Sequence, residues 1–405
     1  MTALHGYLML VLHAHLPYVR HPEHDEFLEE DWLFEAMLET YIPLLQVYDR
    51  LVRDGIAFNI TMTLTPPLCE MLSDSLLVSR FDRHLTKLER LTHKELRRTR
   101  HTPLEACAQF YAQWVRAARA TFEQWQRNLV AGFRHFQDTG QLEIITCSGT
   151  HCLLPLCATP AAARAHVRMA VRNYQKHFGR PPRGIWLAEC AYTEGVEEYL
   201  ADSGIRYFFL DTHGILFGEP RPRFGNFAPV FCPNGVAAFA RDIESSKQVW
   251  SSEVGYPGDV DYREFYRDLG FDADEDYIRP FLHADGRRRN LGIKYHRITG
   301  KVALHAKELY DPAVARERAA EHAGNFLFNR QHQTKHLHDV LGRPPVIVAP
   351  YDAELYGHWW FEGPWFIEFL LRKIACDQRD IATITPGAYL ELFPANQVVQ
   401  PCAST

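Results

Sequence analysis

The sequence predicts an α/β fold built on parallel strands, and three observations lead to that prediction. Short apolar segments alternate with longer segments of helical periodicity, which is the pattern of a parallel barrel or sheet. Polar residues follow the apolar segments, as they do at the carboxyl ends of barrel strands. The 405 residues are 46% hydrophobic, so the chain can bury a large core, and one barrel domain with insertions suits this length as well as two domains.

Six apolar segments have the length and composition of buried strands: residues 7–12, 58–64, 142–146, 184–187, 207–210 and 346–349. The polar residues that follow them are His13, His15, Thr65, Ser148, His151, Glu189, Asp211, His213 and Asp352. Because parallel strands present their carboxyl ends at the same edge, we expect these side chains to gather at one face of the fold.

Capping residues predict helices over residues 159–179, 193–204 and 311–342, where Thr or Asp stands at the start and Gly at the end. Two segments fit the strand–helix alternation poorly. Residues 81–137 are charged and helical in pattern, and residues 218–299 are rich in Gly, Pro, Tyr and Asp. We predict that both are insertions on the face that carries the strand ends, where long insertions shape access to a site.

Two of the predicted strand ends carry a carboxylate beside aromatic residues. Glu189 stands in GIWLAECAY (residues 184–192), and Asp352 stands in APYDAELYGHWWFEGPW (residues 349–365). Retaining glycosidases use two carboxyl groups about 5 Å apart, and indole rings stack on sugar rings. We therefore predict that Glu189 and Asp352 form the acid pair of a sugar-cleaving site. The alternative is that the tryptophans cap a hydrophobic core and that the acids are solvated.

Composition and missing motifs exclude several other functions. The net charge of −6 argues against a nucleic-acid partner, and the apolar run over residues 7–12 is too short for a membrane span or a secretory leader. Nine cysteines without a CxxC pair predict reduced thiols in a cytoplasmic protein. His13 and His15 form a His-x-His pair, but HExxH is absent, as are GxSxG, the P-loop and GxGxxG.

Four segments resemble the conserved regions of glycoside hydrolase family 57, and in particular its 1,4-α-glucan branching enzymes. They are LHAHLPYVRHPE (residues 12–23), EIITCSGTHCLLPL (143–156), GIWLAECAY and APYDAELYGHWWFEGP (349–364), and residues 227–272 resemble the same subgroup. The resemblance implies a distorted (β/α)7 barrel with helical and loop insertions over residues 1–395. It also implies that Glu189 is the nucleophile, that Asp352 is the general acid/base, and that no metal or cofactor is needed.

The resemblance further implies a substrate and a reaction. The substrate is an α-1,4-glucan such as amylose or glycogen, and the reaction transfers a cleaved segment to form an α-1,6 branch. An α-amylase, a 4-α-glucanotransferase and an inactive glucan-binding remnant are the alternatives. The implied substrate-binding residues are His13, His15, His151, Trp32, Asp211, His358, Trp359 and Trp360. Branching enzymes of the family continue into a helical C-terminal domain, so residues 396–405 are expected to be the truncated start of that domain.

Overall fold

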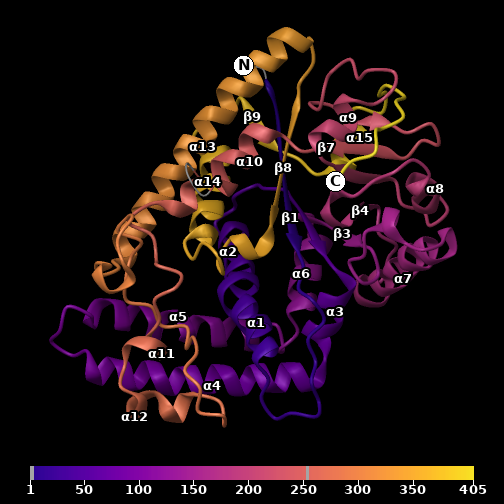
Figure 1. Ribbon diagram of the computed structural model, residues 1–405. Coiled ribbons are helices and arrows are strands. Elements are labelled where there is room, and N and C mark those ends of the chain that lie inside the picture. The colour runs from indigo at the N-terminus through magenta and orange to yellow at the C-terminus, as the bar shows by residue number, and fades with distance from the viewer. Residues whose placement is uncertain (1–3, 252–254) are drawn as a thin grey trace.

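The computed structural model describes residues 4–251 and 255–405, which form a curled, mostly parallel sheet with helices outside it (Figure 1). The sheet order is β6-β7-β5-β4-β3-β2-β1-β8, and β9 pairs with β1. The seven described strands from β7 to β8 pair in parallel, so the predicted barrel of the (β/α)7 type is confirmed, and so are the six predicted strands. The strands are β1 (Gly6–Ala14), β2 (Ile60–Leu64), β3 (Leu142–Cys147), β4 (Gly184–Trp186), β5 (Tyr207–Leu210), β6 (Val230–Phe231), β7 (Ala237–Ala240), β8 (Val346–Asp352) and β9 (Ile381–Thr383).

The helices cover the outer face of the sheet, and none in the described part of the chain is long and apolar enough to cross a membrane. They are α1 (Leu28–Ala36), α2 (Ile42–Arg53), α3 (Pro66–Ser73), α4 (Ser75–Arg98), α5 (Glu105–Gln124), α6 (Leu129–Asp138), α7 (Pro160–Phe178), α8 (Val196–Ala201), α9 (Thr212–Leu216), α10 (Ile243–Trp250), α11 (Leu269–Asp272), α12 (Glu275–Ile278), α13 (Pro312–Leu341), α14 (Gly363–Cys376) and α15 (Pro386–Leu392).

Two of the three predicted helices begin and end where their capping residues stand. Thr159 caps α7 through the N–H of Ala162, and α7 ends at Gly179 in the left-handed conformation. Helix α13 likewise runs from an Asp cap to a left-handed Gly. The predicted start of α8 is wrong, because Gly195 has a φ of 94° and a helix cannot include a left-handed residue at its start. That helix therefore begins at Val196.

Alternation along the strands separates the barrel interior from the layer of helices. In β1, Leu8, Leu10 and Leu12 belong to the apolar cluster that includes the helices, whereas Met9 and Val11 belong to the cluster that fills the barrel. This follows from the two-residue period of a strand. The same alternation places His13, the next odd-numbered residue after Val11, toward the interior at the carboxyl end of β1.

Asp242, directly after β7, joins the two edges of the curled sheet. Its backbone N–H donates to the carbonyl oxygen of Val348 in β8 over 2.8 Å. Its carboxylate caps α10 through the N–H of Ser245 and accepts from the side chains of Arg330 and Gln333 on α13. Arg330 is fully buried, and its charge is compensated by Asp242 and by Glu244, whose carboxylate lies 2.7 Å away. The contacts of Asp242 thus hold β7, β8, α10 and α13 in one arrangement.

The segment 218–299 is only partly an insertion. It contains β7, which pairs with β5 and belongs to the sheet, so the prediction that this whole segment lies outside the strand–helix pattern is wrong. The sequence of β7 is Ala-Ala-Phe-Ala, and alanine is less frequent in strands than β-branched or aromatic residues. The later part carries α11 and α12, which lie against α4: Lys94 donates to the carbonyl oxygen of Tyr277.

Residues 396–405 lie along the barrel. Ser404 forms an antiparallel bridge with Tyr192, Gln400 forms one with Glu219, and Val399 is fully buried. The side chain of Thr405 donates to the carbonyl oxygen of Glu189. The last described residues therefore contact the turn that follows β4.

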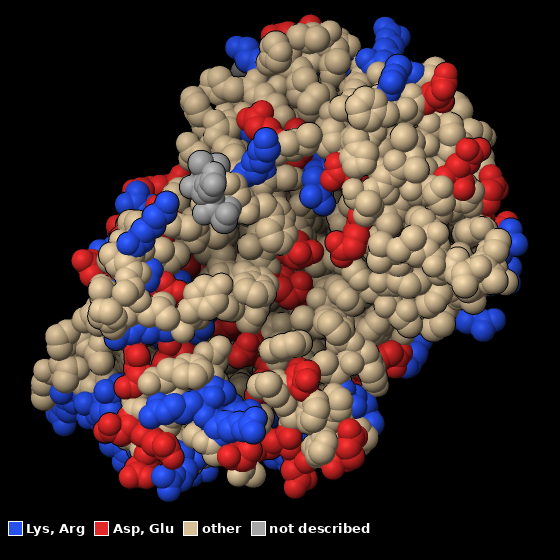
Figure 2. All heavy atoms as spheres, viewed as in Figure 1, with Lys and Arg blue, Asp and Glu red and all other residues tan. Residues whose placement is uncertain are grey.

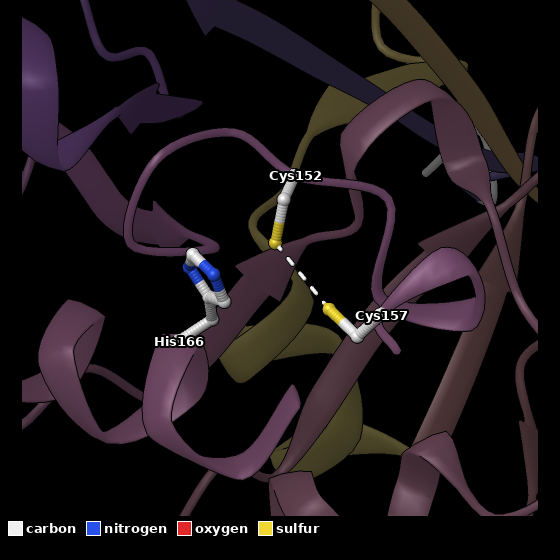
Figure 3. A group of neighbouring side chains, drawn as sticks. All are labelled: Cys152, Cys157 and His166. Carbon is white, nitrogen blue, oxygen red and sulfur yellow. Dashed lines mark hydrogen bonds between the residues drawn. The ribbon is translucent and has the colours of Figure 1, made fainter. Parts of the chain in front are cut away.

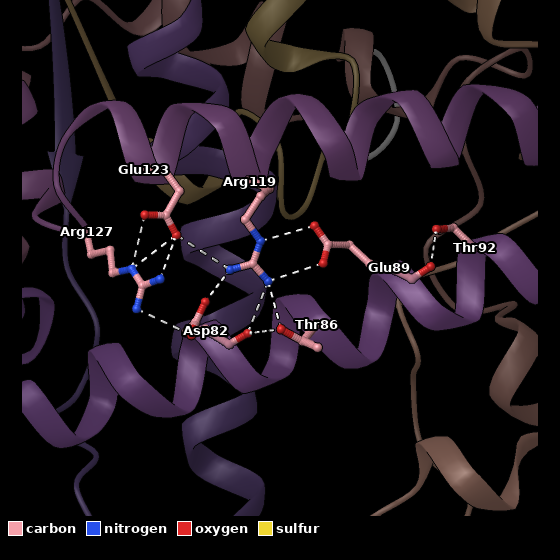
Figure 4. A network of polar contacts seen from close by, with 7 residues as sticks. All are labelled: Asp82, Thr86, Glu89, Thr92, Arg119, Glu123 and Arg127. Atoms are coloured by element: carbon pink, nitrogen blue, oxygen red, sulfur yellow. Dashed lines mark hydrogen bonds and ion pairs between the residues drawn. The ribbon is translucent and has the colours of Figure 1, made fainter.

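Helices α4 and α5 form a hairpin at the lower edge of the view in Figure 1, and a polar network crosses between them (Figure 4). Arg119 of α5 lies between Asp82 and Glu89 of α4; its Nε donates to Glu89 over 3.1 Å, and its guanidinium also bonds Asp82. Arg127 pairs with Glu123 and Asp82 nearer the open end. The side chain of Arg119 is 19% exposed and that of Arg127 is 45% exposed, so water screens the first less.

We expect Arg119→Met to lower the free energy of unfolding by about 1–3 kcal/mol, because it leaves Asp82 and Glu89 without their shared cation. Methionine keeps an apolar stem at the position. The matched variant Arg127→Met should cost less than about 1 kcal/mol. Urea titration followed by circular dichroism measures both. Equal losses in the two variants would contradict the central place of Arg119 in the network.

Candidate active site

The carboxyl ends of the strands open into a cleft with a volume of about 710 Å³. Acidic side chains gather around a hollow at the centre of the face seen in Figure 2. A volume of this size suits an organic ligand. Residues of β1, β4, β8 and α10 and residues that follow β4, β5 and β7 line the cleft; among them are His13, Trp186, Glu189, Asp211, Arg241, Lys247, Trp250, Tyr351 and Asp352.

Glu189 reaches the cleft because the backbone turns sharply after β4. Ala188 and Cys190 on either side of it are buried, whereas Glu189 is exposed. Its φ of 54° and ψ of 26° lie in the left-handed region, which non-glycine residues seldom adopt. This turn directs the carboxylate out of the buried strand and into the cleft that it lines.

Asp352 is the last residue of β8 and lies beside His13, its register partner on β1. Both residues line the cleft. Partial burial and the negative charge of Glu189 raise the pKa of the Asp352 carboxyl group to about 6, while Arg241 opposes the shift. The structure therefore brings the two predicted acids into one cleft and gives Asp352 a carboxyl group that holds its proton to higher pH than an ordinary aspartate.

Three histidines form a stacked wall next to the acids. The Nε2 atoms of His13 and His151 lie 2.9 Å apart, and the rings of His15 and His151 stack with centroids 3.7 Å apart. Burial is the main cause that lowers the pKa of all three, that of His15 to about 3, and the neighbouring imidazoles lower those of His13 and His15 further. The histidines are therefore neutral near pH 7 and can donate and accept hydrogen bonds.

The histidine wall also connects the cleft to a second hollow. His15 and His151 line this neighbouring hollow, whose volume is about 550 Å³, together with residues after β2 and on α7. His13 lines the first cleft and contacts His151 directly. The two hollows therefore lie on either side of the histidine wall, and the acids line the first of them.

Asp211 lies in the cleft as well, at the end of β5. Its carboxylate accepts the N–H of Thr212 over 2.6 Å, and Arg241 Nε lies 3.7 Å from it. Arg241 follows the strand β7 that the sequence did not reveal, so the sequence analysis missed this residue. Lys247 and Trp250 were missed for the same reason, because they stand on α10, which follows β7. Recognising Ala237–Ala240 as a strand would have drawn attention to these positions.

The remaining predicted substrate-binding residues lie outside this cleft. His358 contacts Glu39 over 3.1 Å in a separate pocket between α1, α4 and residues 281–294. Trp359 is 56% exposed and stacks on Phe265, and Trp32 on α1 is 51% exposed. Trp360 is 1% exposed and packs in the core against Tyr262 and Phe366, so it has no free face for a sugar ring. Trp360 therefore fits the alternative stated in the sequence analysis, in which the tryptophans belong to a hydrophobic core.

Comparison with known proteins gives relatives over nearly the whole chain. The 1,4-alpha-glucan branching enzyme TK1436 of Thermococcus kodakarensis is 34% identical over 416 residues, which cover 96% of this chain and 58% of the relative. The crystal structure of TK1436 has a TM-score of 0.86 and covers 98% of this chain. The crystal structure of the alpha-amylase AmyC from Thermotoga maritima has a TM-score of 0.95 at 46% identity, over 99% of this chain and 77% of that one.

The chain thus spans little more than half the length of the archaeal relative, with high structural agreement over the shared part. The family model for glycosyl hydrolase family 57 matches residues 9–401, which include every residue of the cleft except Thr405. The resemblance found in the four sequence segments is confirmed. The chain belongs to glycosyl hydrolase family 57.

Proposed function

We propose that this chain acts on α-1,4-glucans as a retaining transglycosylase that forms α-1,6 branches. One observation carries the proposal: the carboxyl groups of Glu189 and Asp352 face one cleft, and the charge of the first raises the pKa of the second. A retaining mechanism needs one ionised carboxylate and one carboxylic acid with different proton affinities. The raised pKa of Asp352 in the same cleft as Glu189 supports these two roles.

In the first step, the Glu189 carboxylate attacks the anomeric carbon of the bound glucose unit. The bond from that carbon to the glycosidic oxygen breaks, and the proton of Asp352 moves to the departing oxygen. The product is a glucosyl ester on Glu189 and a shortened glucan. Asp352 is then ionised beside an ester that no longer carries charge, so it can act as a base.

In the second step, the Asp352 carboxylate takes the proton from the 6-hydroxyl of an acceptor glucan. The hydroxyl oxygen attacks the anomeric carbon and releases Glu189, which closes the cycle with an α-1,6 bond. Water in place of the acceptor gives hydrolysis through the same atoms. The reaction outcome therefore depends on which hydroxyl reaches the ester first.

The surroundings of the acid pair suit a neutral, hydroxyl-rich ligand. The neutral imidazoles of His13, His15 and His151 can exchange hydrogen bonds with sugar hydroxyls without repelling the substrate or binding it too tightly. Trp186 and Trp250 supply indole surface in the same cleft. The hollow on the far side of the histidine wall offers room for further sugar units.

Relatives favour branching and also support a second candidate. TK1436 is named a 1,4-alpha-glucan branching enzyme, and the Thermotoga protein of 46% identity is named an alpha-amylase. The second candidate for this chain is accordingly hydrolysis of α-1,4 bonds. Both reactions share the Glu189 ester, so a single assay of products distinguishes them.

We expect the purified chain to introduce α-1,6 branches into amylose, and we expect Glu189→Gln and Asp352→Asn each to lower the rate at least about 10³-fold. Debranching followed by chain-length analysis counts the new branches, and a reducing-end assay on the same samples counts hydrolysis. Glu198→Gln on α8 is the matched control, because that carboxylate is exposed and does not line the cleft.

The products separate the candidate functions. New branches with few new reducing ends support branching, whereas many reducing ends with few branches support an α-amylase. Binding of amylose with neither product, unchanged in Glu189→Gln, would mean a glucan-binding protein without turnover and would refute the proposed role of the acid pair.

We expect kcat/KM to fall as the pH rises through about 6, because Asp352 must carry a proton to act as the acid. Arg241→Leu removes the cation that lowers the pKa of Asp352, so it should move this fall in activity to higher pH. Lys247→Leu is the control, since Lys247 lines the same cleft and is not among the groups that shift Asp352. A pH–rate profile with a soluble maltooligosaccharide measures the effect.

If the pH–rate profiles of Arg241→Leu and Lys247→Leu shift equally, the shift would reflect the loss of positive charge in general rather than the loss of Arg241. A profile that moves in neither variant would show that a group other than Asp352 governs the fall. Either result would contradict the assignment of Asp352 as the acid.

A further inference from the structure

Two cysteines and a histidine meet on the outer side of the barrel, away from the residues that line the cleft. Cys152 follows β3 in the loop that carries His151, Cys157 ends the short 3-10 turn Leu154–Leu156, and His166 stands on α7. Figure 3 shows their side chains converging on one small space. One ligand atom from each lies within 4.8 Å of the other two, and the two Sγ atoms are 3.9 Å apart.

The sulfur separation fits a tetrahedral metal ion. With Zn–S bonds of about 2.3 Å, two thiolates on a tetrahedral zinc ion lie about 3.8 Å apart. The two sulfurs thus need little movement to bind one ion. All three side chains are half-buried, so the pocket shields the ligands and still leaves a path for an ion from solvent.

His166 provides a second, independent sign of a missing ligand. Its Nδ1 atom is buried and has no hydrogen-bond partner within residues 4–251 and 255–405. A buried polar nitrogen without a partner lowers stability, so native proteins usually pair such an atom. The ring lies beside the two sulfurs, as Figure 3 shows. An ion bound by the three side chains would give the imidazole a binding partner.

Backbone contacts hold the three ligands in place without the ion. The hydroxyl of Ser148 donates to the carbonyl oxygen of Cys152 over 2.9 Å, and the N–H of Gly149 donates to that of His166 over 3.1 Å. A Cβ atom at position 149 would lie 3.2 Å from the His166 oxygen, so glycine permits this close approach of loop and helix. The N–H of Cys157 donates to the carbonyl oxygen of Leu154.

We propose that Cys152, Cys157 and His166 form a structural zinc site that ties the loop carrying His151 to α7. Two thiolates and an imidazole favour Zn²⁺ over Mg²⁺ or Ca²⁺, which prefer oxygen ligands. A water molecule takes the fourth position, and binding releases the two thiol protons. Because the thiol protons must leave, zinc affinity should increase with pH. The proposal does not depend on the glucan reaction.

The test is zinc uptake by the full chain after reduction and treatment with a chelator. We expect one equivalent of Zn²⁺ per chain in the wild type, and at least tenfold weaker binding in Cys157→Ser and in His166→Gln, measured by competition with a chromophoric chelator. Cys376→Ser is the matched control, because Cys376 is an exposed free cysteine at the end of α14. It should bind zinc as the wild type does.

Cobalt provides a measurement that needs no variant. Co²⁺ bound to the wild type should show the thiolate-to-cobalt charge-transfer absorption, which Zn²⁺ abolishes by displacement. Added zinc should also raise the melting temperature of the wild type and of Cys376→Ser but not of Cys157→Ser.

A wild type that takes up no more zinc than Cys157→Ser, or that gives no cobalt–thiolate absorption, would overturn the proposal. A Cys152–Cys157 disulfide would also overturn it. In that case two thiols would be lost to alkylation in the untreated protein and would return with a reductant, whereas zinc-protected thiols return with a chelator.

Discussion

The arrangement of the cleft depends on how the edges of the curled sheet are joined at Asp242. Its N–H binds Val348 of β8, and its carboxylate caps α10 and neutralises the buried Arg330. β8 pairs with β1 on one side; on the other side the N–H of Val346 donates to the carbonyl oxygen of Phe227, and the Asp242 contact fixes β8 nearer to Asp352. The placement of Asp352 opposite Glu189 is therefore a property of the closed sheet rather than of either strand alone. Asp242, which does not line the cleft, thus helps to fix the position of Asp352.

The electrostatics of the site follow from the same closure. The inward face of the strands excludes water from the imidazoles, which stay neutral, while partial burial and the charge of Glu189 raise the pKa of the Asp352 carboxyl group. Arg241, which pairs with Asp211 in the same cleft, opposes the rise in the pKa of Asp352. The site therefore combines two acids, of which Asp352 has a raised pKa, with a neutral hydrogen-bonding wall. Sugars, which carry many hydroxyls and no charge, suit such surroundings.

The sequence predicted the strands and helices that are marked by particular residues, such as a carboxylate after a strand or a capping residue at the end of a helix. Apolar strands ending on a carboxylate, and helices bounded by Thr-Pro or Asp-Pro and Gly, appear in the structure where the sequence indicated them. β7 was missed because its alanines carry no strand preference, and its position is decided by pairing with β5. Trp360 was misassigned because burial of an indole ring is a tertiary property: Trp359 and Trp360 are neighbours in sequence, yet one is exposed and the other lies in the core. Adjacency in the chain cannot distinguish them.

The left-handed backbone at Glu189 has a consequence for how this fold can change. Only glycine and asparagine adopt that conformation at little cost, and a glutamate there forgoes about 1–2 kcal/mol of stability. Two further residues have a left-handed backbone nearby. Cys190 follows β4 with a φ of 55°, and His151 follows β3 with a φ of 58°. Selection for stability alone would replace these residues, and the replacement that relieves most strain at position 189 would also remove its carboxylate. Three of the seven positive-φ non-glycine residues within residues 4–251 and 255–405 thus lie at the strand ends beside the cleft, and the surrounding structure must hold these turns in place.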